Sequence, residues 1–161
     1  MAQKFYATIK AATQGTLKGQ GTGRDKSKIE GVGFSYGVES PRDPASGLPR
    51  GKRQHKPVVF TKEWGAASPQ LYQATATNEV LQSVLFEFIS TNALGKEEVD
   101  YTVELTNATI AEFKGSVHLG EKAGPIVDSR ELEIIKLVFQ KITITSVAGA
   151  TSTTDDWEFE A

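Results

Sequence analysis

Apolar and polar residues alternate with a period of two along most of this chain. Near the N-terminus, Phe5, Ala7 and Ile9 are separated by Tyr6 and Thr8. A period of two is typical of β-strands because successive side chains point to opposite faces. The same pattern predicts strands within residues 29–38, 57–61, 80–90, 99–106, 109–119, 130–145 and 154–161.

One segment departs from the alternation and predicts a short helix. Ser68-Pro69 places serine at the N-cap and proline at the first helical position, a combination that favours helix initiation. About three turns follow, containing Leu71, Tyr72, Ala74, Ala76 and Thr77. We expect no other helix.

Residues 39–56 show neither the period of a strand nor that of a helix, and they predict a long protruding loop. The prolines and glycines of this stretch are Pro41, Pro44, Gly47, Pro49 and Gly51. Irregular stretches of this length are uncommon inside compact domains and usually signal function or disorder. The stretch ends in a basic cluster, which we expect to be a binding surface for a partner: Arg50, Lys52, Arg53, His55 and Lys56.

Many strands with one helix predict a mostly β, single-domain β-barrel or sandwich over residues 1–161. Several predicted strands carry apolar side chains on both faces, as in residues 80–90. An antiparallel sheet needs only one apolar face. The excess predicts a second buried surface, which we place between subunits.

Charge is distributed unevenly along the chain, although the net charge is only −2. Residues 1–62 hold 12 Lys and Arg against 4 Asp and Glu, whereas residues 63–161 hold 6 against 16. Two interpretations stay open. Either the solvated faces differ by chance, or the protomer has oppositely charged poles that suit head-to-tail stacking with its own copies.

The residues needed for catalysis or metal binding are scarce, so we expect a protein that is not an enzyme and needs no cofactor. The chain has no cysteine, and its only histidines are His55 and His118, with His118 expected on a solvent-facing strand position. No G-x-S-x-G elbow occurs. Carboxylates among polar residues are expected to form solvated faces: Glu97, Glu98, Asp100, Glu104, Asp155 and Asp156.

Two binding motifs fail closer inspection. The glycine-rich residues 19–27 match neither nucleotide-binding fingerprint and are expected to form a flexible turn. The basic residues 50–56 lack interleaved aromatics, and the chain's pI is about 5.7, so nucleic acid is not the expected partner. Contact with another protein is favoured.

The N-terminus has no apolar signal region, and no apolar run approaches the length of a membrane span. We therefore expect a chain that is cytoplasmic before assembly, does not insert into membranes, and leaves the cell without an N-terminal signal peptide.

Five segments resemble the haemolysin-coregulated protein (Hcp) family, the tube-forming proteins of type VI secretion systems. The most specific is GKRQHKPVVFTKE at residues 51–63, a basic loop that runs into a strand. The others are IEGVGFSYGV (29–38), SPQL (68–71), ELEIIKLVFQKI (131–142) and DDW (155–157). Phage tail-tube proteins are related to this family in fold.

The resemblance implies a β-barrel whose six copies close into a ring, with rings stacked into a tube. It implies three partners besides the chain itself: a spike at the tube tip, a contractile sheath and secreted effectors in the lumen. We expect the loop of residues 39–56 to reach the next ring through its basic tip, and the lumen to be polar. A phage-type tail-tube protein and a monomeric ligand-binding β-domain are the alternatives.

Overall fold

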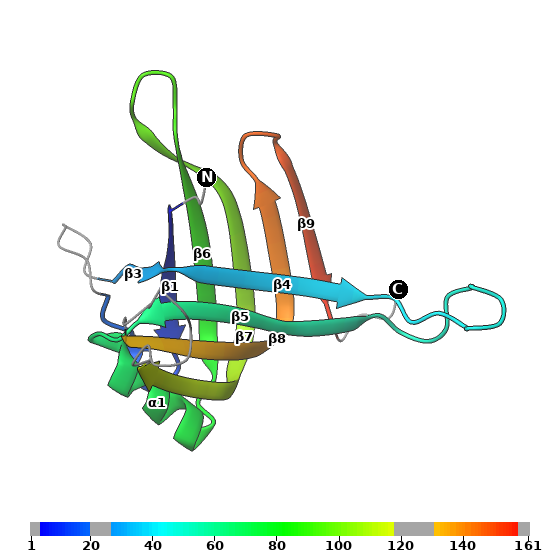
Figure 1. Cartoon of the computed structure of the whole chain (residues 1–161), viewed down its shortest axis with the longest axis horizontal. Helices are drawn as coiled ribbons and strands as arrows, with labels where there is room; N and C mark the ends of the chain where they lie inside the picture. Colours follow the sequence, from blue (N-terminus) through cyan, green and yellow to red (C-terminus); the bar gives the residue numbers. More distant parts are fainter. Residues whose placement is uncertain (1–3, 20–26, 118–130, 158–161) are drawn as a thin grey trace, which may run out of the picture.

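The computed structural model describes residues 4–19, 27–117 and 131–157, which form nine strands and one helix (Figure 1). The helix, α1, spans Ala67–Thr77 and lies between β5 and β6 in the chain. The strands are β1 (Lys4–Ala11), β2 (Gly15–Thr16), β3 (Ile29–Gly31), β4 (Gly33–Glu39), β5 (Gln54–Glu63), β6 (Leu81–Thr91), β7 (Glu97–Val117), β8 (Glu131–Ser146) and β9 (Thr151–Asp156). The predicted mostly β fold with one short helix is confirmed.

All strand pairs are antiparallel, and their order is β2-β1-β6-β7-β8-β5-β4, with β3 on β1 and β9 on β8. Only Val32 separates β3 from β4. Because β3 pairs with β1 while β4 pairs with β5, the path of paired strands returns to β1. The sheet therefore curls round into a barrel.

Strand β8 has different neighbours along its length, which opens the barrel at one side. Its first half, residues 132–137, pairs with β5, and its second half, residues 141–146, pairs with β9. Strands β4 and β5 therefore diverge from β8 and β9 beyond this point, as Figure 1 shows. The space between the two strand pairs holds the candidate site.

Inward-facing residues of the strands form one apolar core, as the alternation predicts. Phe5, Ala7 and Ile9 on β1 are all buried. Aromatic rings fill the centre, where Phe60 packs edge-on against Phe86 with 5.4 Å between ring centroids. The tight packing extends to the backbone of the sheet, because a Cβ atom at Gly31 would overlap the ring of Phe5.

Helix α1 packs on β7 through Ala67, Leu71 and Ala74, which are buried. It ends at Asn78, which has φ +54°, and the Glu79 N–H donates to Ala74 O at 2.9 Å. This left-handed residue is a common helix C-terminus.

The predicted helix start is wrong in detail. Ala66 occupies the N-cap position and no side chain caps the helix. Ser68 lies in the first turn, where its hydroxyl donates to Glu133 Oε1 at 2.6 Å and accepts from the Gly65 N–H at 2.9 Å. The serine hydroxyl is thus used to join the helix to β8, which explains why it does not cap.

That contact belongs to a buried ionic network beneath the helix. Lys62 on β5 and Glu133 on β8 face each other in the strand ladder and form an ion pair, with side chains 0% and 2% exposed. The Lys62 ammonium also donates to Glu63 O at 2.8 Å and contacts Ser68 Oγ at 3.2 Å. Every charge in the network therefore has a partner.

Two strand predictions need correction. Residues 99–106 and 109–119 were expected to form two strands, but β7 runs through both, from Glu97 to Val117. The strand continues through the polar Asn107, which has φ +51°, and through a bulge between Ile110 and Glu112. The final strand was expected at residues 154–161, whereas β9 ends at Asp156.

Some expectations concern residues outside the described ranges. These are most of the turn expected at residues 19–27, the position of His118, and the part of the tail that contains Phe159.

Candidate functional site

The predicted loop protrudes from the barrel between β4 and β5, as Figure 1 shows in cyan. It is more ordered than its sequence indicated, because backbone hydrogen bonds cross it. The Arg50 N–H donates to Pro41 O at 2.7 Å, and the Asp43 N–H donates to Leu48 O at 2.9 Å. Residues 54–56, expected to be irregular, belong to β5.

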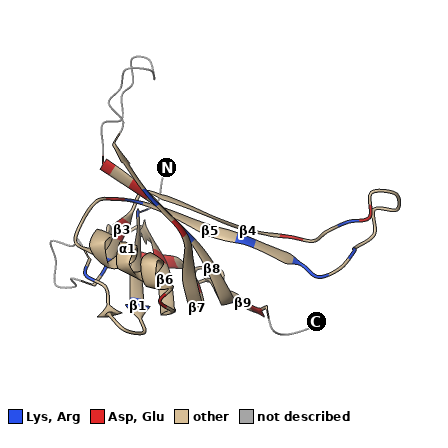
Figure 2. Cartoon of the chain, turned by 90° about the horizontal axis from the view of Figure 1, so that it is seen from below, with Lys and Arg blue, Asp and Glu red and all other residues tan. Residues whose placement is uncertain are grey.

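The five basic residues predicted as a contact surface fall into two groups. Arg50, Lys52 and Lys56 are exposed. Arg53 and His55 instead turn back toward β9, where both meet Asp155. Figure 2 shows blue segments along the loop and β5.

Arg53 forms a bidentate ion pair with Asp155, which lies 102 positions away in the sequence. The Arg53 Nε and Nη2 atoms each lie 2.6 Å from a different oxygen of Asp155, and Nη2 also donates to Asp156 O at 2.8 Å. The hydrogen bond from Arg53 lowers the pKa of Asp155, while partial burial opposes this shift and His55 adds to it. The pKa of Arg53 is raised by the same contact.

His55 also contacts Asp155, and its side chain is buried. Its side chain is only 6% exposed, and its Nε2 lies 2.7 Å from Asp155 Oδ2. Because an ionised carboxylate can only accept, Nε2 carries the proton. The ring packs against Trp157 and Phe139, with centroids 5.0 and 5.2 Å away. We call Arg53, His55 and Asp155 the loop-base cluster.

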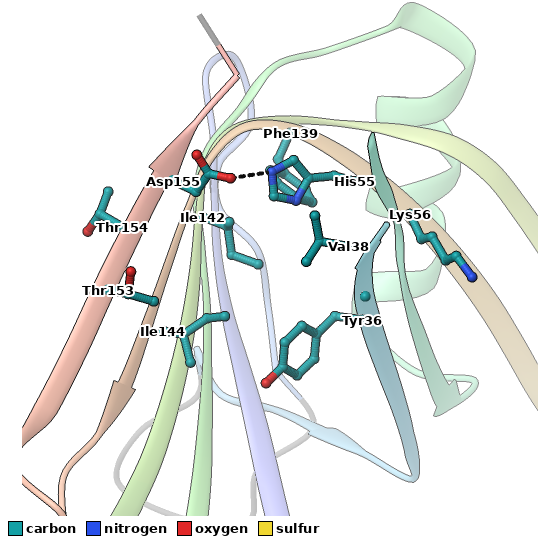
Figure 3. Close-up of a pocket in the computed structure, with 11 residues that line it drawn as sticks. Tyr36, Val38, His55, Lys56, Phe139, Ile142, Ile144, Thr153, Thr154 and Asp155 are labelled. Atoms are coloured by element: carbon teal, nitrogen blue, oxygen red, sulfur yellow. Dashed lines mark hydrogen bonds and ion pairs between the residues drawn. The ribbon is translucent and has the colours of Figure 1, made fainter. Parts of the chain in front are cut away.

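A cavity of about 470 Å³ lies below this cluster, between β4–β5 and β8–β9. Its inner surface is mainly apolar, and Figure 3 shows Val38, Ile142 and Ile144 pointing into a common space, with the His55–Asp155 contact at one end. We call this cavity the apolar slot. Its apolar lining comes from Tyr36, Val38, Phe139, Ile142 and Ile144.

Tyr36 and Tyr101 lie between the slot and the aromatic core. Their hydroxyl oxygens are 2.7 Å apart. Burial raises the pKa of Tyr101 to about 12, and the hydrogen bond with Tyr36 adds to this shift. Tyr101 is therefore neutral at physiological pH, and the pair is a structural contact.

Side chains suited to metal binding do not gather within residues 4–19, 27–117 and 131–157: no group of three or more could hold an ion there. The same ranges contain no helix long and apolar enough to cross a bilayer. Of the six carboxylates expected to be solvated, Glu97 and Glu98 are exposed, whereas Asp155 holds the loop-base cluster. Sequence reasoning missed this role, because nothing local to Asp155 signals a partner 102 positions away.

These features define an antiparallel, mostly β protein that has a protruding loop and, at the base of that loop, an exposed apolar slot. A family of known proteins with this architecture matches the chain: the profile described as "Type VI secretion system effector, Hcp" covers residues 6–145. The protein therefore belongs to the Hcp family of type VI secretion systems, as its sequence motifs indicated.

Individual relatives agree with this assignment. The chain is 34% identical over 167 residues to the "Major exported protein" of Pseudomonas aeruginosa, covering 98% of this chain and 96% of that one. A crystal structure of an Hcp protein superposes with a TM-score of 0.88 at 27% identity, covering 99% and 100% of the two chains. An Hcp protein of the Escherichia coli EAEC 042 pathovar gives 0.84 at 29% identity, covering 97% and 99%.

Proposed function

We propose that this protein is a structural subunit, not an enzyme, and that its 161 residues form one tube domain. Six copies close into a ring, and rings stack into the inner tube of a type VI secretion system. Membership of the Hcp family is the observation that carries this proposal. The spike at the tube tip, the contractile sheath around it and effectors within it are the proposed partners.

Contact between rings is assigned to exposed basic residues of the protruding loop. Arg50 and Lys52 are exposed on the C-terminal side of the loop, and the second part of the chain carries the surplus of carboxylates. Opposite charges set the register between two surfaces and accelerate their encounter. Arg53 and His55, which the sequence grouped with these residues, have a different role in this proposal because they hold the base of the loop.

The hydroxyl groups that pair along β8 and β9 support the proposal of a polar lumen. Thr143 and Thr154 lie 3.2 Å apart at their hydroxyl oxygens, and Thr145 and Ser152 lie 3.1 Å apart. A surface of this kind would bind folded effectors weakly and release them. We propose that the chain is cytoplasmic before assembly and is exported with the tube, without a signal peptide.

Native mass spectrometry and negative-stain electron microscopy of the purified full chain test this function together. The expected results are a hexamer mass and annular particles that form short stacks at higher protein concentration. A monomer that persists across micromolar concentrations, with no annular particle, would contradict the proposal and favour a ligand-binding β-domain.

A further inference from the structure

The protruding loop is carried by two strands that separate from the rest of the barrel. Strand β5 pairs with β8 only through residues 58–63, whereas residues 54–56 pair with β4 and not with β8. Beyond residue 57 the two strands continue as a ribbon that ends in the loop (Figure 1). We call residues 37–56, which include the loop, the arm. A two-stranded ribbon is only marginally stable without further contacts, so contacts outside its own ladder must fix its direction.

The arm leaves the barrel at a point with the features of a hinge. The β4–β5 ladder changes register between Ser35 and Gly37 and skips Tyr36. Pro57 lies in the facing strand at this irregularity and has no N–H to donate. The Tyr36 hydroxyl oxygen lies 2.7 Å from that of Tyr101 on β7, which holds this point to the barrel. Hinges are formed by a few residues of this kind, where regular pairing is interrupted.

The loop-base cluster joins the arm to the end of β9. Arg53 donates to both carboxylate oxygens of Asp155 at 2.6 Å and to Asp156 O at 2.8 Å. His55 adds a contact of 2.7 Å with Asp155, and its ring packs on Trp157. Bidentate bonds between charged groups fix the relative geometry of their partners. The cluster therefore sets the angle between the arm and β9.

Packing does not fix this angle along the rest of the arm. The apolar slot leaves about 470 Å³ between the arm and the strands β8 and β9. Figure 3 shows Val38 of the arm facing Ile142 and Ile144 across this space, and Val38 is 59% exposed. Close-packed side chains would hold two elements at a fixed distance. Without them, the arm has room to turn once the cluster is broken.

We propose that the loop-base cluster is a latch that sets the direction in which the loop protrudes. With the latch closed, the arm has one orientation, and with Asp155 disengaged the arm pivots about Tyr36 and Pro57 as a unit. Asp155 is thus a positioning residue, because it contacts Arg53 and His55 and acts on the loop through them. The latch couples the end of β9 to the loop within one protomer and goes beyond the proposed self-assembly.

Distances between two spin labels test the latch, because the chain has no cysteine of its own and label sites can be chosen freely. The variant A45C/Q73C places one label on the exposed loop and the other on the exposed face of α1. Labelled chains are diluted with unlabelled chains that carry the same latch residues, so that each measured distance lies within one copy. We expect D155N to widen the distribution of distances at least about twofold, as a free hinge requires.

A second variant removes the contact from the side of the arm. R53Q should widen the distribution as D155N does, and D155N/R53Q should widen it no further, because both changes break one interaction. The matched control is E30Q, which neutralises an exposed carboxylate on β3 and should leave the distribution unchanged. The Trp157 N–H, which donates to Gln140 O at 2.9 Å, should exchange faster in R53Q, because coupling between two sites is reciprocal.

Hydrogen exchange of the loop distinguishes a pivoting arm from an unfolding one. The Asp43 and Arg50 amides donate to carbonyls within the loop and should remain protected in D155N, because the arm moves as a unit. A wider distribution together with faster exchange of these two amides would show that the loop unfolds, and it would overturn the hinge. An unchanged distribution in both D155N and R53Q would overturn the latch. Neither result affects the proposed ring, whose test is the mass of the assembly.

Discussion

Lys62 and Glu133 are opposite one another in the β5–β8 ladder, and their charged ends meet where solvent does not reach. Burying two charges has a large desolvation cost, which the pair offsets only while both partners and their hydrogen bonds are present. The network also fixes the start of α1, because Ser68 contacts both charges.

Removing one member of this pair should be strongly destabilising. We expect E133Q to lower the free energy of unfolding by about 3–5 kcal/mol, because Lys62 would remain buried without a counter-charge. Urea denaturation followed by circular dichroism at neutral pH measures the loss.

The matched control is E112Q, which breaks the exposed Glu112–Lys136 pair at 3.0 Å. Its expected cost is below about 1 kcal/mol. Equal losses in E133Q and E112Q would contradict a special role for burial.

Asp155 should stabilise the fold only while it is ionised. Its pKa is lowered in the folded state, chiefly by the hydrogen bond from Arg53. Its contribution is therefore present above the ordinary carboxyl pKa and is lost as the pH falls through the lowered folded value. D155N should melt a few degrees below the wild type at about pH 7, and this difference should shrink as the pH falls below the ordinary carboxyl pKa.

The control for Asp155 is E39Q, which neutralises an exposed carboxylate on β4. We expect the melting temperature of E39Q to follow the wild type at each pH. A D155N difference that stays constant across the titration would show that its effect does not come from ionisation.

Reversing the charge of exposed basic residues in the loop should separate stacking from ring closure. R50E/K52E is expected to yield rings that no longer stack, while Arg53 keeps its contact with Asp155. Raising the salt from about 0.1 to 1 M should weaken wild-type stacking in the same direction, because screening shortens the reach of exposed charges from about 10 to 3 Å.

Electron microscopy of R50E/K52E beside K10E/K18E measures the effect. The control reverses two exposed lysines outside the loop and should stack normally. Normal stacks in R50E/K52E would exclude these two loop residues from the contact between rings.

The Tyr36–Tyr101 pair should be visible in an alkaline titration. Tyr101 has its pKa raised to about 12, first by burial and then by Tyr36. In Y36F, burial persists but the hydrogen bond is lost, so the Tyr101 pKa should fall part of the way toward 10. Ultraviolet difference spectra of the phenolate, with Y101F to identify the signal, provide the measurement.

Stability should follow the same titration. Since the folded pKa of Tyr101 lies above the unfolded value, the stabilising contribution is complete below about pH 10 and is lost as the pH rises through about 12. A melting temperature that falls equally in Y101F over this interval would contradict the assignment.

The sequence predicted those elements whose cause is local. Alternation of Phe5, Ala7 and Ile9 placed β1 because burial of one sheet face imposes a period of two. The helix was predicted from Ser68-Pro69, but Ser68 is not its N-cap: it lies in the first turn, where its hydroxyl bonds to Glu133, 65 positions away.

Errors arose where the tertiary structure overrides local pattern. Asn107 and Ala108 looked like a break between strands, yet pairing with β8 carries β7 through them. At the candidate site, the division of the basic cluster into exposed residues and residues that contact β9 depends on Asp155, which no spacing in the sequence connects to Arg53.

The length of β7 has a mechanical consequence. With 21 residues, the strand measures roughly 70 Å along its backbone at about 3.3 Å per residue. It is hydrogen-bonded to β6 on one side and to β8 on the other. Over residues 101–108, where both neighbours pair with β7, a load applied along the strand would have to shear two rows of bonds at once, so thrust delivered at the hairpin tip is shared with β6 and β8.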